Sequence, residues 1–140
     1  NGPGDPAENV SVIREIAKLY QSDVPIFAIC LGHQLMALAT GASTYKLKYG
    51  HRGGNHPVKD LETGRVYISS QNHGYAVDSG SLDPAVAVPA FVNVNDQTNE
   101  GLRYTGKNIF TVQFHPEACP GPRDLGYLFD KFFQMMEVDR

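Results

Sequence analysis

The sequence lacks the features that usually mark membrane proteins, exported proteins and nucleic-acid-binding proteins. No apolar run approaches the roughly 20 residues that a membrane-spanning helix needs, and no signal peptide is recognisable, so nothing points to export. Lysines and arginines are not clustered and the net charge is −3, which argues against nucleic acid as the main partner. We therefore expect a cytoplasmic protein that binds neither membranes nor nucleic acids.

Cysteine is also scarce, with only Cys30 and Cys119. A chain of 140 residues can form one hydrophobic core and does not need a stabilising disulfide, so we expect two thiols. The five histidines do not stand in the spacings of a zinc site, and no G-x-x-x-x-G-K-[ST] loop occurs. The sequence therefore predicts no metal site and no ATP-binding loop within this chain.

The first forty residues predict a helix, a buried strand and a second helix. Asp5 can cap a helix that begins at Pro6, and apolar residues recur at helical spacing as far as Tyr20. Residues 26–29 are all apolar, which is typical of a strand buried on both faces of a sheet. A second helix is expected over residues 33–40, followed by a glycine cap. This alternation predicts an α/β layered fold.

The rest of the sequence is rich in strands and ends in a helix. Residues 45–58 predict a strand followed by an irregular loop, "HRGGNHP", with a structural or subunit-contact role. Further strands are expected in the first half of 65–78, in 85–96 and in 99–117. The segment 124–138 predicts an amphipathic helix. Its apolar face consists of Leu125, Leu128, Phe129, Phe132, Phe133 and Met136.

Cys30 stands where the apolar strand meets the second helix. A side chain at such a turn lies at the carboxyl edge of the sheet, where open α/β sheets bind ligands. The text Ala28-Ile29-Cys30-Leu31-Gly32 is similar to the G-x-S-x-G nucleophile elbow, with cysteine as the nucleophile. The helix N-terminus favours a thiolate and can lower the cysteine pKa. The alternative is an inert cysteine of the core.

Two later residues complete the chemistry that a cysteine nucleophile needs. His115, in "VQFHPE", can act as the base, and Glu117 can hold its imidazole in one tautomer. The N–H of Leu31 and the glycine-rich segment "NGPGDP" can supply the donors of an oxyanion hole. Cysteine, histidine and glutamate in this order on an α/β pattern indicate a hydrolase.

The segments "NGPGDP", "FAICLGHQ", "QNHG" and "VQFHPEA" together resemble the class I, or triad, glutamine amidotransferases, over essentially all 140 residues. More narrowly, "YKLKYGHRGGNHPV" and "SSQNHGYAVD" resemble the small-subunit family of the carbamoyl-phosphate synthases. The resemblance implies a flavodoxin-like layered mixed sheet flanked by helices. Residues 1–140 would be the glutaminase domain, a C-terminal fragment of a longer small subunit whose N-terminal strands are missing.

By position, the resemblance makes Cys30 the nucleophile, His115 the general base and acid, and Glu117 the residue that orients it. Gly2 and Leu31 match the oxyanion-hole donors. The matching substrate-binding positions are Gly2, Gly4, Leu31, Gln34, Asn72, Gly74 and Tyr75. Ala28 departs from the glycine that the family often has at the elbow.

The implied reaction is the hydrolysis of L-glutamine to glutamate and ammonia through a γ-glutamyl thioester. The ammonia would pass to a large synthetase subunit, which makes carbamoyl phosphate for arginine and pyrimidine synthesis. That subunit uses bicarbonate, ATP and Mg, and the domain itself needs no cofactor. Two other functions stay open: a glutaminase or γ-glutamyl hydrolase that serves another system, and a non-catalytic amidotransferase-like interaction domain.

Overall fold

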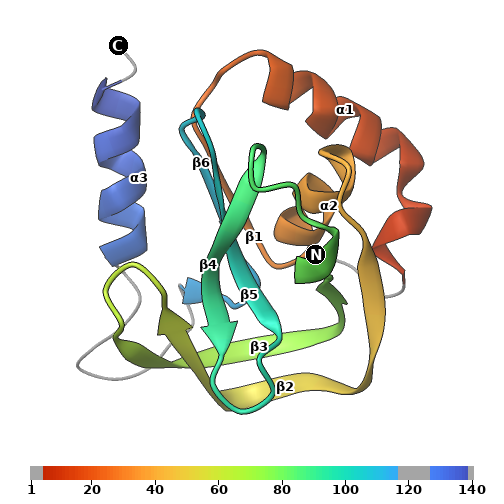
Figure 1. The fold of residues 1–140 in the computed structure, drawn as a ribbon, viewed down its shortest axis with the longest axis vertical. Helices are drawn as coiled ribbons and strands as arrows, with labels where there is room; N and C mark the ends of the chain where they lie inside the picture. The colour runs from red at the N-terminus through yellow and green to blue at the C-terminus, as the bar shows by residue number, and fades with distance from the viewer. Residues whose placement is uncertain (1–4, 117–126, 139–140) are drawn as a thin grey trace.

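The structure, a computed structural model, describes residues 5–116 and 127–138. Figure 1 shows a twisted sheet with α1 and α2 on one face and α3 on the other. The elements in chain order are η1 (Pro6–Glu8), α1 (Val10–Gln21), β1 (Ile26–Ile29), α2 (Leu31–Ala39), β2 (Thr44–Asp60), β3 (Val66–Val77), η2 (Ser79–Ser81), β4 (Ala87–Asn93), β5 (Asn99–Tyr104), β6 (Ile109–Val112) and α3 (Tyr127–Val138). None of the described helices is long and apolar enough to span a membrane.

The described strands form one six-stranded mixed sheet in the order β1-β6-β5-β4-β2-β3. β1 and β6 are parallel, and each of the other neighbouring pairs is antiparallel. Helices cover both faces of this sheet, so the predicted layered α/β fold is confirmed.

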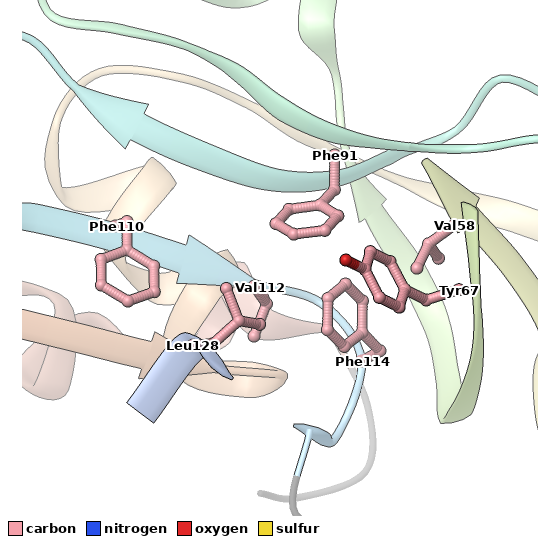
Figure 2. Close-up of a cluster of buried hydrophobic side chains, with 7 residues drawn as sticks. All are labelled: Val58, Tyr67, Phe91, Phe110, Val112, Phe114 and Leu128. Atoms are coloured by element: carbon pink, nitrogen blue, oxygen red, sulfur yellow. The ribbon is translucent and has the colours of Figure 1, made fainter. Parts of the chain in front are cut away.

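A separate hydrophobic core lies on each face of the sheet, because successive side chains of a strand point to opposite faces. In β6, Phe110 and Val112 belong to the core beneath α3, whereas Ile109 packs with Met36 and Ala37 of α2. Figure 2 shows the first core, in which Leu128 of α3 lies beside β6. The residues labelled there are Val58, Tyr67, Phe91, Phe110, Val112, Phe114 and Leu128.

β1 is less buried than its apolar sequence predicts. All four of its residues are half-buried rather than buried on both faces. The reason is its place at the edge of the described sheet, where β6 is its only neighbouring strand. Helices still cover its two faces, since Phe27 stacks on Phe110 at 4.4 Å between ring centroids and packs against α3, while Ile26 packs with the α2 core.

The predicted capping residues Asp5 and Gly41 are found, but the helices begin at other residues than predicted. Asp5 accepts a hydrogen bond from the Ala7 N–H at 2.9 Å, but it caps the short 3-10 turn η1, and α1 begins only at Val10. α2 begins at Leu31, two residues before the predicted start, and Gly41 follows it at φ +97°, as expected of a glycine cap.

The last helix presents a slightly different face to the core than its sequence predicts. Leu128 is buried and Phe132 and Met135 pack against the same core, at the i, i+4, i+7 spacing of one helical stripe. Phe133 was expected in that stripe but is 55% exposed, because it follows Phe132 by about 100° around the helix. Leu125 lies outside the described residues.

The predicted irregular loop at "HRGGNHP" is wrong. These residues lie inside β2, which continues through them to Asp60. β2 pairs along the whole of β3, and β3 is longer than the strand predicted in the first half of 65–78. The pairing register shifts between Lys46 and His51 and again between Gly53 and His56. Gly50 and Gly53, with positive φ, allow these irregularities, so the glycines mark bulges within a strand.

Candidate active site

Cys30 occupies a strained turn between β1 and α2. Its φ of 55° and ψ of −109° lie outside the regions that side chains usually adopt. The backbone N–H donates to the Val112 carbonyl at 2.8 Å, and the carbonyl accepts from the Gln34 N–H at 3.2 Å. Cys30 therefore ends the strand ladder and starts the helix, as the elbow pattern predicts. Its side chain is a thiol rather than half of a disulfide, and the residue is 5% exposed.

Small neighbours make this turn possible. A Cβ added at Gly32 would lie 3.4 Å from the Cβ of Ala28. The alanine that replaces the usual elbow glycine therefore fits because the residue facing it has no side chain.

The parallel pairing of β1 with β6 brings the predicted nucleophile and base to the same edge of the sheet. Ile29 pairs with Val112, so Cys30 and His115 both follow the carboxyl ends of adjacent strands. The His115 N–H donates to the Ser70 carbonyl at 3.0 Å, which ties this edge to β3. Figure 1 shows β2 and β3 crossing the lower ends of the other strands.

Several predicted site residues lie outside the described part of the chain. They are Gly2, Gly4 and Glu117, and Cys119, which was predicted only to be a thiol, lies there too. Leu31, the other predicted oxyanion-hole donor, is the first residue of α2. N–H groups in the first turn of a helix point toward its N-terminal end, which here begins at Cys30.

A chain of buried hydrogen bonds leads from β3 to the Cys30 sulfur. Gln34 Nε2 donates to the Tyr75 carbonyl at 2.8 Å and to Gln113 Oε1 at 3.0 Å. Gln113 Nε2 in turn donates to Cys30 Sγ at 3.7 Å. Tyr75 thus joins the site through its backbone. Of the other predicted substrate residues on β3, Asn72 is exposed and Gly74 is half-buried.

Sequence reasoning missed Gln113. A polar residue stands between the apolar Val112 and Phe114 at the end of a strand, and that was the available signal. Val112 and Phe114 both belong to the core beneath α3. By strand alternation Gln113 faces the other side, toward α2 and Cys30.

His33, in the first turn of α2, is a structural histidine. It is fully buried, its Nδ1 lies 2.7 Å from the Thr111 hydroxyl, and its Nε2 has no hydrogen-bond partner among the described residues. Burial, with a smaller effect of His73, lowers the pKa of His33 to about 3. The ring is therefore neutral, and the expectation that it packs and hydrogen-bonds near the elbow is confirmed.

A second buried polar cluster, centred on Gln71 of β3, joins this strand to β2 and β5. Gln71 Oε1 lies 3.1 Å from His51 Nδ1 and 2.7 Å from His73 Nε2, and Gln71 Nε2 donates to Glu100. His51 Nε2 lies 2.7 Å from Asp96. This cluster reaches the candidate site because His73 Nδ1 lies 2.8 Å from the Tyr75 carbonyl that also accepts from Gln34.

The two histidines of this cluster have pKa values shifted in opposite directions. Glu100, 3.7 Å from His51 Nδ1, and then Asp96 raise the pKa of His51 to about 9 against the effect of burial. Burial lowers the pKa of His73 to about 4, although the Tyr75 carbonyl opposes this. Burial also raises the pKa of Glu100, against its contacts with His51. At neutral pH, His51 is an imidazolium between two acids and His73 is neutral.

Among the described residues, His51, His73 and Glu100 come closest to a metal-binding arrangement, with ligand atoms within 4.8 Å of one another. The Gln71 amide oxygen already lies within hydrogen-bond distance of His51 Nδ1 and His73 Nε2. Gln71 and the two histidines therefore pair within the cluster without a metal, whereas Glu100 Oε1 has no hydrogen-bond partner among the described residues. The expectation that this chain binds no metal stays a prediction.

The model of the family "Glutamine amidotransferase class-I" matches residues 1–135. The chain therefore belongs to the class I glutamine amidotransferases. The carbamoyl phosphate synthase small chain of Symbiobacterium thermophilum is 58% identical over 140 residues, which cover 98% of this chain and 38% of the relative. The small chain of Methanocaldococcus jannaschii is 56% identical over 137 residues, with 98% and 38% covered.

The chain thus spans about 38% of the length of these relatives. Among solved structures, a glutamine amidotransferase from Thermotoga maritima has a TM-score of 0.69 at 24% identity, covering 99% of this chain and 62% of that one. This likeness confirms the fold. The roles assigned to individual residues stay predictions.

Proposed function

We propose that the chain is the glutamine-hydrolysing part of a carbamoyl-phosphate synthase small subunit. The observation that carries this proposal is the strained Cys30 elbow, with His115 following the adjacent parallel strand. Relatives at more than half identity are named as small chains of that synthase, which supports this choice within the family.

The first half of the reaction forms a thioester. The Cys30 thiolate attacks the side-chain amide carbon of L-glutamine, and the carbonyl oxygen becomes an oxyanion facing the N–H of Leu31 and, by resemblance, of Gly2. His115 as imidazolium gives its proton to the leaving nitrogen, the C–N bond breaks and ammonia departs. The product of this half is a γ-glutamyl thioester on Cys30.

The second half releases glutamate. His115, now neutral, takes a proton from water, and the hydroxide formed attacks the thioester carbon. The C–S bond then breaks, glutamate leaves and the thiolate is restored. Glu117 would hold the His115 ring in the tautomer that both halves require.

Gln34 has a defined part in binding glutamine. Both N–H groups of its amide are engaged, one by the Tyr75 carbonyl and one by Gln113. Gln34 therefore offers a ligand only its amide oxygen, which accepts hydrogen bonds. The matching group of free glutamine is an N–H donor such as the α-ammonium. The carboxylate would instead face the other predicted substrate-binding positions, Gly4, Asn72 and Gly74.

The ammonia would be used by a large synthetase subunit together with bicarbonate and ATP. Ammonia is a nucleophile only when unprotonated, so a closed passage that excludes water preserves it. ATP and Mg belong to that partner, and this domain would work without a cofactor. The proposal includes a cytoplasmic location and a role in arginine and pyrimidine synthesis.

The test is to measure glutamine-dependent ammonia release with and without the large subunit, for the parent and for Cys30→Ala. We expect the parent to support carbamoyl phosphate formation from glutamine, and Cys30→Ala to support it only from added ammonia. Ammonia release that never supports carbamoyl phosphate synthesis would indicate a glutaminase of another system. A parent without glutaminase activity would indicate a non-catalytic interaction domain.

A further inference from the structure

Gln113 is a fully buried amide whose hydrogen-bonding groups both face the candidate site. It is 0% exposed and lies beside Cys30, because each residue directly follows the last pair of the β1–β6 register, Ile29 with Val112. A buried amide is costly unless its polar atoms are hydrogen-bonded. No catalytic or substrate-binding role has been assigned above to Gln113 itself, which so far enters only as a hydrogen-bond partner of Gln34.

The orientation of the Gln113 amide follows from one backbone carbonyl. The Tyr75 carbonyl can only accept, so the Gln34 atom 2.8 Å from it is the amide nitrogen. That nitrogen has a second N–H, which points to Gln113 at 3.0 Å, so the facing Gln113 atom is the oxygen. The nitrogen of Gln113 is therefore the atom that faces Cys30 Sγ at 3.7 Å.

We propose that Gln113 is a positioning residue for the Cys30 nucleophile: its Nε2–H holds Sγ in place and favours the thiolate. A donor that bonds to the charged form of a group stabilises that form. The amide cannot accept the thiol proton, so His115 remains the base. This inference rests on the proposed function, in which Cys30 is the nucleophile.

The same contacts couple the sulfur to the substrate-binding side of the site. Gln34 bridges Gln113 and β3, and the Tyr75 carbonyl also lies 2.8 Å from His73 Nδ1. Removing Gln113 takes away one of the two acceptors that fix the Gln34 amide. We therefore expect a change at Gln113 to lower kcat through the sulfur and to raise KM through Gln34.

The experiment compares the pH dependence of Cys30 alkylation by iodoacetamide in Gln113→Glu, Gln113→Met and the parent, each in a Cys119→Ser background. Glutamate nearly matches glutamine in shape but places an acceptor or a negative charge near Sγ, and methionine removes the donor. We expect the midpoint of the alkylation profile to rise by about one pH unit in Gln113→Met, and further in Gln113→Glu. Ile109→Val, a buried change in β6, controls for lost packing and should leave the midpoint unchanged.

Coinciding midpoints in the parent and in a folded Gln113 variant would overturn the proposal. Gln113→Glu provides this test if Gln113→Met does not fold. The alkylation profile does not depend on turnover, so the two proposals can fail separately. A parent that hydrolyses no glutamine would overturn the proposed function, whereas an active parent with unshifted variants would overturn only the role of Gln113.

Discussion

The Cys30 N–H donates to the Val112 carbonyl at 2.8 Å, and this bond ends the parallel ladder between β1 and β6 at the proposed nucleophile. It fixes the backbone of Cys30 from one side while α2 fixes it from the other, through the Gln34 N–H. Two regular elements therefore hold a residue whose own φ of 55° is unfavourable.

The strain at this elbow predicts that glycine is more stable than alanine at position 30, which is the reverse of their order within a helix. Cys30→Gly and Cys30→Ala both remove the sulfur, but only glycine adopts a positive φ without steric cost. We expect Cys30→Gly to be more stable to urea than Cys30→Ala by about 1 kcal/mol. The opposite order is expected at Ala37, buried within α2, where Ala37→Gly lowers stability. An unstrained elbow would show the helix-like order at both positions.

Alanine variants at two glycines of β2 distinguish the effect of backbone strain from the effect of displacing β3, which carries predicted substrate-binding residues. Gly50 and Gly53 both have positive φ, but a Cβ at Gly50 would lie 2.9 Å from the His73 carbonyl, whereas one at Gly53 would meet nothing within 4 Å. Gly53→Ala should lower the free energy of unfolding by about 1 kcal/mol because of its φ alone, and Gly50→Ala should lower it further because the added Cβ also clashes with backbone.

Only Gly50→Ala should also raise the KM for glutamine several-fold, because it displaces the strand that carries Asn72, Gly74 and Tyr75. Steady-state glutaminase kinetics on both variants check this. Equal KM values for the two variants would show that the β2–β3 contact does not shape the substrate site.

These bulges also show where prediction from the sequence stops. The Cys30 elbow was predictable because an apolar run, a cysteine and a helix follow one another locally. The second half of β2 was not, since its glycines fit a loop equally well until β3 is known to pair with it. Gln113 and the His51–Glu100 pair were missed for the same reason: their partners are far away in sequence, and only the strand order brings them together.

The buried histidines predict a stability maximum close to the ordinary histidine pKa. His51 has its pKa raised from 6.5 to about 9, so its contribution to stability is complete below pH 6.5 and is lost as the pH rises through 9. His33 and His73 have pKa values lowered to about 3 and 4, so their contribution is present above pH 6.5 and is lost as the pH falls below it. The urea midpoint of unfolding, measured from pH 4 to 10, should therefore decrease on both sides of a maximum near pH 6.5.

A pair of variants tests whether His51 causes the loss of stability on the alkaline side of this profile. His51→Gln should lower stability at neutral pH, because it leaves Glu100 without its cation, and should flatten the loss between pH 6.5 and 9. His56→Gln changes a half-buried histidine on the same strand and controls for the loss of an imidazole there. An alkaline slope that survives in His51→Gln would contradict the assigned ion network.

The most direct test of the account is covalent labelling of the protein with a diazo-ketone analogue of glutamine, followed by mass spectrometry of its peptides. An electrophile that resembles the substrate should react with the nucleophile of a formed glutamine site. The account predicts modification of Cys30 alone, prevented by excess L-glutamine and absent in Cys30→Ala. Glutamine-protected labelling of Cys119, or glutamine hydrolysis that persists in Cys30→Ala, would contradict it.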